Sequence, residues 1–359
     1  MDLTLSRYHQ ARLDLVSGVK ALAGYRLSPQ IRAKYEKVAA EEQIPEAQMR
    51  DRAYMAGRIG VDPLYQASRG LQRITQELMW REVARGLEPR RAALEAELEA
   101  KGPADAATLA LDPDLDVPAY FAETEFHLQP GGLWRDPLTG PIYEIGVQHF
   151  NLHRFGKSGA EMGLALLQGL PEGFAPQSFL EMGCGPGYKM YPVMDAFPQA
   201  EAHGIDISAS LLRYAYRRAL DHGRKVHYAQ MNAEKLAAFP QARFDLVYDM
   251  ILLHEVPVSA TRNILREAFR VLKPGGIYAD LDLPAYRDVD PLTAFMMDWD
   301  TDNNGEPFWR DYHELDMKRE MAEAGFVDVE FRSVSSAALQ RQGNYQGKWA
   351  YRVVVGRKP

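Results

Sequence analysis

The chain has 359 residues, of which 46% are hydrophobic and 25% charged, and its formal net charge is −7. This length exceeds what one hydrophobic core usually holds, so we expect two domains. The negative balance argues against sequence-independent capture of nucleic acid, which needs a basic surface. No apolar run approaches the roughly 20 residues of a membrane-spanning helix, and residues 1–15 lack the apolar stretch of a signal peptide. With one cysteine, Cys184, an internal disulfide is excluded, and we expect a soluble cytoplasmic protein.

The first third of the chain has a helical pattern. Apolar residues recur at three- and four-residue spacing over residues 3–22 and 64–84, which is typical of amphipathic helices. Pro63 is placed to open the second of these helices, while Gly86 and Pro89 can end it. Residues 102–118 are rich in Asp, Pro and Ala and are predicted to be a linker. We therefore predict an all-α domain over residues 1–115, serving as a lid or for dimerisation, and a second domain over residues 116–359.

Short apolar runs alternate with helical patterns from about residue 177 onward. The runs predicted to be strands cover residues 177–182, 202–207, 226–230, 245–251 and 277–283, and the helical patterns between them cover 188–197, 209–222 and 260–272. This alternation predicts βαβ units and a parallel sheet covered on both faces. Two more strands, at 327–334 and 349–356, have no crossover helix between them and are expected to pair antiparallel.

A glycine-rich loop, Gly183-Cys184-Gly185-Pro186-Gly187, joins the first of these strands to the next helix. Glycines let the backbone turn sharply and approach a ligand closely, and a helix start offers free N–H groups. The spacing is G-x-G-x-G with Glu181 in front of it, whereas the dinucleotide fingerprint is G-x-G-x-x-G. The pattern predicts a site for a ligand at the carboxyl ends of the strands.

A second acid, Asp206, ends the next predicted strand. An ionised carboxylate at this position can accept hydrogen bonds from both hydroxyls of a ribose. It can alternatively cap the helix that starts near Ser208. With the glycine loop upstream, the ribose interpretation predicts a nucleoside-containing cofactor.

Three further segments follow in a fixed order. They are Gln230–Glu234 after the third strand, Phe244–Met250 as the fourth strand, and Arg270–Gly276, which reads RVLKPGG, before the fifth. Together with the glycine loop and Asp206, they resemble the class I S-adenosylmethionine-dependent methyltransferase superfamily over about residues 145–359, and its small-molecule branch most closely. The resemblance implies an α/β fold with a Rossmann-like sheet of seven strands, mostly parallel with an antiparallel C-terminal strand, behind the N-terminal all-α domain. It also implies S-adenosyl-L-methionine as cofactor and methyl transfer to O, N or C of a small metabolite.

The resemblance assigns particular residues to the cofactor. The implied contacts are Glu181, Gly183, Gly185, Gly187, Asp206, Ile207, Asn232, Ala233, Asp249 and Met250. Many members carry Asp where Asn232 stands, but the amide oxygen of Asn can still accept a hydrogen bond from the adenine amino group. We add Arg154, whose guanidinium suits the methionine carboxylate.

The acceptor side is predicted from position and residue type. His254 follows the fourth strand and is the first candidate for a general base, with a structural role as the alternative. Residues 284–316 form an insertion rich in aromatic and acidic residues, which we predict to be a substrate lid and in which His313 is a second catalytic candidate. The same aromatic residues can instead form the core between lid and sheet. The predicted substrate contacts are Tyr143, His149, His153, Tyr286, Trp309 and Tyr312.

Other sites and functions stay open. No metal is expected, because residues 300–311 lack the glutamate of a calcium loop and His149 and His153 are not in an H-E-x-x-H pattern. An RNA methyltransferase is compatible with the basic run from Arg81 to Arg91, although the acidic balance opposes it. An NAD-dependent oxidoreductase would need a third glycine one residue later. A non-catalytic S-adenosylmethionine-binding module, with a partner on the helical domain, is the third alternative. As partners we expect a small-molecule substrate and no membrane, with a homodimer left open.

Overall fold

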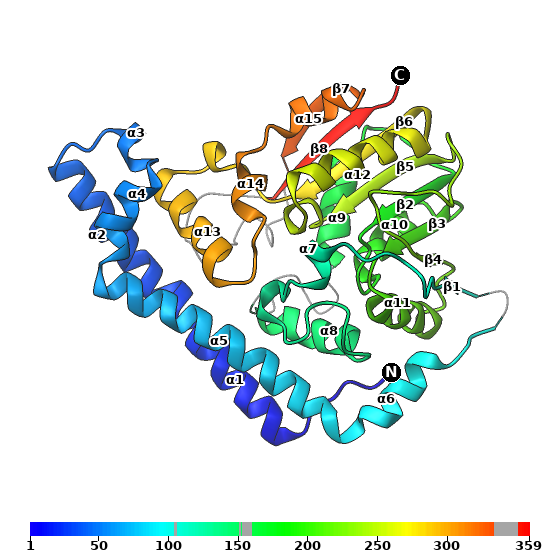
Figure 1. Cartoon of the computed structure of the whole chain (residues 1–359), viewed down its shortest axis with the longest axis horizontal. Helices are drawn as coiled ribbons and strands as arrows, with labels where there is room; N and C mark the ends of the chain where they lie inside the picture. The colour runs from blue at the N-terminus through cyan, green and yellow to red at the C-terminus, as the bar shows by residue number, and fades with distance from the viewer. Residues whose placement is uncertain (104–105, 151, 153–159, 334–350) are drawn as a thin grey trace.

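A long helical arm lies along one side of a sheet-centred body in the computed structural model (Figure 1), which describes residues 1–103, 106–150, 152, 160–333 and 351–359. The arm, residues 7–87, consists of α1 (Arg7–Leu22), α2 (Ser28–Glu41), α3 (Glu46–Met49), α4 (Arg52–Met55) and α5 (Pro63–Leu87). α1 and α5 lie side by side, and α6 (Arg91–Glu99) leads from the arm to the body. The start predicted for α5 is confirmed, because Pro63 is its first residue and the Asp62 carboxylate accepts from Leu64 N.

Eight strands form one sheet in the body. They are β1 (Thr108–Ala110), β2 (Ser178–Met182), β3 (Glu201–Asp206), β4 (His227–Gln230), β5 (Phe244–Met250), β6 (Leu272–Asp282), β7 (Val327–Ser333) and β8 (Arg352–Arg357). Their order is β1-β4-β3-β2-β5-β6-β8-β7, and every neighbouring pair is parallel except the two that β8 makes. The predicted Rossmann-like sheet with an antiparallel C-terminal strand is thus confirmed. The eighth strand is β1, a short strand inside the predicted linker.

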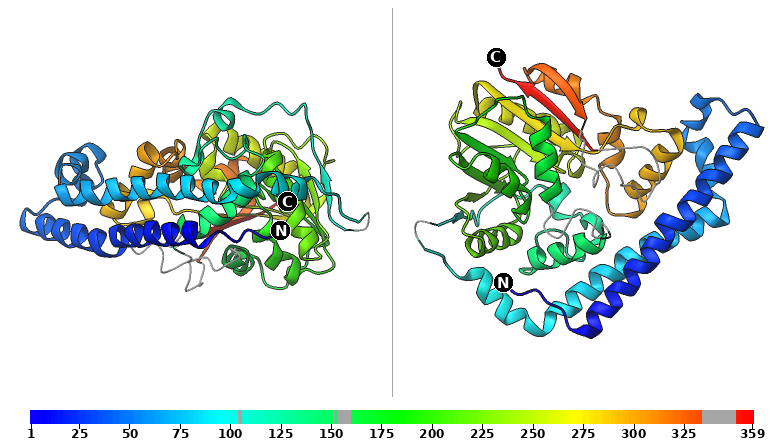
Figure 2. Two further views of the ribbon diagram at one scale, coloured as in Figure 1. Left: turned by 90° about the horizontal axis from the view of Figure 1, so that it is seen from below. Right: turned by 180° about the vertical axis from the view of Figure 1, so that it is seen from behind.

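Helices cover both faces of the sheet (Figure 2). Those of the body are α7 (Ala119–Ala122), α8 (Thr139–Phe150), α9 (Ala160–Gly169), α10 (Tyr191–Ala196), α11 (Ala209–Asp221), α12 (Val258–Val271), α13 (Pro291–Asn303), α14 (Trp309–Glu314) and α15 (Met317–Glu323). α13 and α14 lie in the predicted insertion and reach the far end of the arm, while α8 packs against its near end. A buried cluster that includes Leu13, Trp80, Ile142 and Tyr214 joins arm and body. No helix in the described part of the chain is long and apolar enough to cross a membrane.

Candidate active site

A pocket lies at the carboxyl ends of β2, β3 and β5, under the turn around Phe126, and its empty space, including the part open to solvent, is about 840 Å³. Its walls are largely apolar and aromatic, as is usual for small-molecule sites. They include Tyr120, Phe121, Phe126, Leu133, Tyr143, Leu211, Met231, Ile251, Leu252, Val256 and Ile264, with the polar residues His127, Lys189, Asp206, Asn232 and Glu255. Open α/β sheets place ligands at this edge, as the sequence predicted for this chain.

The glycine loop and Asp206 form the floor of the pocket. Gly183, Gly185 and Gly187 all have positive φ, a conformation that other residues rarely adopt. Asp206 is 8% exposed; its Oδ2 accepts from Gly185 N at 2.8 Å and its Oδ1 from Ser208 N at 2.8 Å. Burial raises the pKa of Asp206, and the two backbone N–H groups oppose that rise. The cap of α11 is Ser208 itself, whose Oγ accepts from Leu211 N, so Asp206 remains directed at the pocket.

Several predicted cofactor residues line the pocket, and others lie behind it. Gly183, Gly185, Asp206, Ile207, Asn232 and Ala233 are on its walls. The structure does not place Glu181, Gly187, Asp249 and Met250 there. Glu181 and Asp249 are fully buried behind the glycine loop, and burial raises their pKa values to about 8 and about 7. The Met250 carbonyl accepts from Lys189 Nζ at 2.8 Å, and a Cβ at Gly187 would lie 2.5 Å from the Tyr228 hydroxyl. Arg154 lies outside the described residues.

His254 does not reach the pocket wall. Its ring is 1% exposed; Nδ1 lies 2.6 Å from Asp282 Oδ1 and Nε2 lies 3.3 Å from Glu255 Oε1. Burial alone would lower the pKa of His254, but the two carboxylates outweigh it and raise the pKa to about 10. A ring that keeps both protons at neutral pH cannot accept another, so the geometry favours the structural alternative for His254.

The aromatic residues of the insertion pack around His313. The His313 Nδ1 lies 2.6 Å from the Pro284 carbonyl, its ring stacks on Tyr286 at 4.6 Å, and burial lowers its pKa to about 4. The Trp309 ring meets His254 edge-on at 5.5 Å, and Tyr312 is 4% exposed beside them. This placement matches the core interpretation of the insertion, because none of the four lines the pocket.

The remaining predicted substrate contacts divide in three ways. Tyr143 lines the pocket. His149 faces the arm, where its Nδ1 lies 2.9 Å from Ser17 Oγ. His153 lies outside the described residues.

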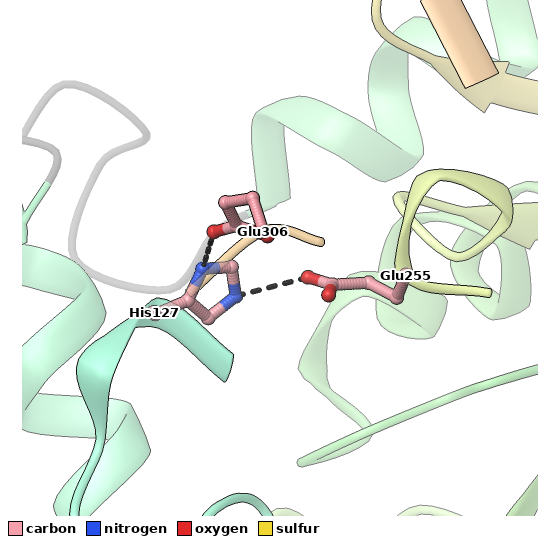
Figure 3. A group of neighbouring side chains, drawn as sticks. All are labelled: His127, Glu255 and Glu306. Carbon is pink, nitrogen blue, oxygen red and sulfur yellow. Dashed lines mark hydrogen bonds and ion pairs between the residues drawn. The ribbon is translucent and has the colours of Figure 1, made fainter. Parts of the chain in front are cut away.

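The sequence analysis missed a cluster formed by His127, Glu255 and Glu306 (Figure 3), of which His127 and Glu255 line the pocket. His127 Nε2 lies 3.1 Å from Glu255 Oε1, and His127 Nδ1 makes a short contact with Glu306 Oε1. Burial would raise the pKa of Glu255, but His127 and His254 lower it to about 2; burial and Glu255 raise the pKa of Glu306 to about 7. Two features of the sequence pointed to this cluster: the many aromatic and His residues around His127, and the position of Glu255 next to His254.

The turn that carries His127 is held by the arm. His127 and Leu128 have φ of 56° and 61°, a conformation that non-glycine residues adopt at some cost and that is frequent at functional sites. The His127 carbonyl accepts from two side chains of α5, Gln76 Nε2 at 2.9 Å and Trp80 Nε1 at 2.6 Å. The arm therefore determines where the His127 ring lies.

Comparisons with known proteins agree with a methyltransferase fold. Residues 179–276 match the family model described as "Methyltransferase domain". The ubiquinone biosynthesis O-methyltransferase of Pseudomonas fluorescens is 35% identical over 106 residues, which cover 29% of this chain and 43% of the relative. The trans-aconitate 2-methyltransferase of Azoarcus sp. is 35% identical over 113 residues, which cover 30% of this chain and 42% of the relative. A solved structure of Haemonchus contortus phosphoethanolamine N-methyltransferase 2 is 18% identical, with a TM-score of 0.45 over 60% of this chain and 57% of that one.

The parallel sheet, the glycine loop and the acid at the tip of β3 define a nucleoside-binding α/β protein. Residues 179–276 match more particularly a methyltransferase domain, and the match supports the resemblance stated from the sequence for this segment. The matches span less than half the length of the two curated relatives.

Proposed function

We propose that the chain is an S-adenosylmethionine-dependent methyltransferase whose acceptor is a small molecule. The observation that carries the proposal is Asp206, a buried carboxylate held at the tip of β3 by the N–H groups of Gly185 and Ser208. Each of its oxygens has a second lone pair available for a ribose hydroxyl. The mostly apolar pocket suits a small acceptor, and the two curated relatives are named for small molecules.

The residues of the chain would bind and orient the two reactants. When bound, S-adenosylmethionine supplies a methyl group on a sulfonium sulfur. Asp206 would hold the ribose, Ile207, Met231 and Ala233 would surround the adenine, and Asn232 would meet its edge. The aromatic walls would exclude water from the acceptor, which favours methyl transfer over side reactions. Residues 1–115 would act as a separate helical domain that braces the pocket, and the cytoplasmic location stays a prediction.

Calorimetry with S-adenosylhomocysteine tests the proposal. Asp206→Ala removes the ribose acceptor and Gly185→Arg fills the floor of the pocket, so each should weaken binding by about 10- to 100-fold. Asp195→Ala on α10, where Asp195 forms an ion pair with Arg224 away from the pocket, is the control and should bind as the parent does. Circular dichroism establishes that the variants are folded. Folded Asp206→Ala and Gly185→Arg variants with parental affinity would overturn the proposal, and NAD uptake without S-adenosylhomocysteine uptake would favour an oxidoreductase.

A further inference from the structure

An alternating chain of acids and histidines leads from the protein interior to the pocket. In order, its members are Asp282, His254, Glu255, His127 and Glu306, and we call them the acid–histidine chain. Each of the four ring nitrogens faces a carboxylate oxygen. A neutral imidazole has only one N–H, so each histidine is either an imidazolium or faces a protonated carboxyl group. The arrangement therefore stores protons beside the pocket.

The geometry favours hydrogen bonding over metal binding. One ligand atom each of His127, Glu255 and Glu306 lie within 4.8 Å of one another. However, Figure 3 shows the two carboxylates at opposite nitrogens of the His127 ring. An ion bound to one nitrogen at the usual distance of about 2 Å would face away from the carboxylate on the other side.

Glu255 has one oxygen left for a ligand. Its Oε1 contacts both His127 and His254, whereas its Oε2 is buried and has no hydrogen-bond partner among the described residues. Glu255 also lines the pocket, together with His127 and Tyr143. A buried carboxylate oxygen without a donor is costly, and a bound molecule with an N–H or O–H group would remove that cost.

The charges around Glu255 disfavour an anionic ligand. The titratable groups that face it are His127, His254, Glu306 and Tyr143, and Asp206 lies across the pocket. Lys189, the lysine on the pocket wall, donates to the Met250 carbonyl. The ionised Glu255 oxygen would repel an anion, and the ring nitrogens of both histidines already face carboxylates, so these rings offer an anionic ligand no donor.

We propose that Glu255 Oε2 binds the methyl acceptor by accepting a hydrogen bond from it, and that this acceptor is a hydroxyl or amine group on an apolar body rather than a carboxylate. The inference rests on the proposed function. Bound S-adenosylmethionine would supply the methyl group and keep the electron pair of the broken carbon–sulfur bond, Glu255 would orient the acceptor oxygen or nitrogen toward that methyl group, and the acceptor proton would be released to water. His127 and His254 are positioning residues that fix the carboxylate.

Three matched probes test the acceptor class on protein saturated with S-adenosylhomocysteine: benzyl alcohol, benzylamine and benzoate. Calorimetry should show the alcohol or the amine binding at least about 10-fold more tightly than benzoate, because one hydrogen bond to a charged group gives that difference. Comparison of benzyl alcohol with benzylamine shows whether the site prefers a hydroxyl or an amine donor. Glu255→Gln should remove most of the preference, whereas Glu172→Gln, an exposed residue before β2, should keep it.

A pH series tests whether His127 positions the Glu255 carboxylate or only packs against it. Benzylamine affinity should stay constant from pH 6 to about 4.5 in the parent, since Glu255 remains ionised and Glu306 is already largely protonated, and should fall with pH in His127→Gln, where the Glu255 pKa returns toward its ordinary value. Benzoate binding as tightly as the other probes, no probe binding at all, or an unchanged preference in Glu255→Gln would each overturn the inference. If the protein does not take up S-adenosylhomocysteine, the proposed function is overturned as well. If it takes up S-adenosylhomocysteine but shows one of the outcomes above, only the inference about Glu255 is overturned.

A different observation concerns the outer face of the arm. Tyr8, Ala11, Leu15, Gly18 and Leu22 are all exposed on α1, with Leu15 69% and Leu22 48% accessible. Their spacing of three and four residues is that of the a and d positions of a coiled coil. Leu13, on the opposite side of α1, is fully buried in the cluster that joins arm and body. α1 therefore presents a second apolar stripe, which we call the outer stripe.

The residue sizes in the outer stripe fit a second copy of the same stripe. If two α1 helices run antiparallel about a two-fold axis between residues 16 and 17, Leu15 meets Gly18 and Ala11 meets Leu22. A Cβ at Gly18 would touch nothing within 4 Å, so there is room for the leucine. Leu15 and Leu22 then each meet a small residue, Tyr8 faces Tyr25, and two-fold symmetry repeats each pair.

We infer that the outer stripe pairs two copies of this chain. Sedimentation equilibrium should give a dimer for the parent, and Leu15→Glu should give a monomer, because two-fold symmetry buries each introduced charge. Leu164→Glu changes a comparably exposed leucine on α9 and should remain dimeric. A monomeric parent at about 100 μM, or a Leu15→Glu variant that stays dimeric, would overturn the inference. Equal melting temperatures would show that Leu15→Glu affects assembly and not the fold.

Discussion

One glycine lets Glu306 reach His127. Gly305 has φ of +71° and precedes Glu306, and a Cβ there would overlap the Glu125 carbonyl and lie 3.0 Å from Leu128 N. Those atoms belong to the turn that carries His127. The close approach of two backbones thus closes one end of the acid–histidine chain, and only glycine permits it.

We expect Gly305→Ala to separate the two backbones. The variant should lose about 1 to 3 kcal/mol of stability and most of its methyl transfer, because the positive φ and the overlap both act against the side chain. Gly173→Ala is a matched control, since Gly173 has φ of +74° but open space around its Cβ. Thermal unfolding and turnover of labelled S-adenosylmethionine measure the difference. If Gly305→Ala loses no more stability and turnover than Gly173→Ala, the backbone contact is unimportant.

Among the elements, α5 links the arm to the chemistry of the pocket. Trp80 is fully buried, its ring stacks on Tyr143 at 6.4 Å, and a Cβ at Gly146 of α8 would overlap it. The indole N–H donates to the His127 carbonyl, so the same side chain packs the arm on α8 and fixes the turn above the pocket. An arm that only paired subunits would not need this contact.

Trp80→Phe keeps most of the ring and removes the donor. It should cost about 1 to 3 kcal/mol of stability and lower kcat more than the affinity for S-adenosylhomocysteine, because the His127 carbonyl loses one of its two donors and the ring shifts. Trp299→Phe on α13, whose ring does not line the pocket, is the comparison variant. Equal losses of kcat in both variants would contradict a specific role of α5.

The elements that could be predicted from the sequence are those with a clear hydrophobic periodicity or with a residue that marks where the element begins or ends. Pro63 opens α5, and the alternation of strands and helices from residue 177 predicted the parallel sheet, because buried strands and amphipathic helices differ in period. β1 was missed, since a three-residue edge strand has no period to detect. His127 and Glu306 are 179 residues apart, and no spacing rule predicts their contact. Only the packing of α5 and α13 against the body brings them together.

At the scale of the whole molecule, buried acids set how stability depends on pH. Burial raises the pKa values of Glu181 and Asp300 to about 8 and that of Asp249 to about 7, well above the values near 4 that these groups have in an unfolded chain. Between about pH 4 and 8 the folded protein therefore binds more protons than the unfolded chain. Stability from these groups is complete below pH 4 and is lost as the pH rises through 8. His254, with its pKa raised to about 10, also loses its contribution to stability as the pH rises above 6.5, the ordinary pKa of histidine.

The melting temperature should consequently fall by about 5 °C or more between pH 6 and pH 9. At acid pH the dependence has the opposite sign, because the stability that Glu255 and His313 contribute is complete above their unfolded pKa values and is lost as the pH falls to their folded values of about 2 and about 4. Asp300→Asn should flatten the alkaline fall, since an amide cannot ionise, while Asp14→Asn on the exposed side of α1 should leave it unchanged. Differential scanning calorimetry across this range checks both variants. A melting temperature that rises from pH 6 to 9 would mean that these acids are ionised in the folded protein and held by cations that the fold supplies.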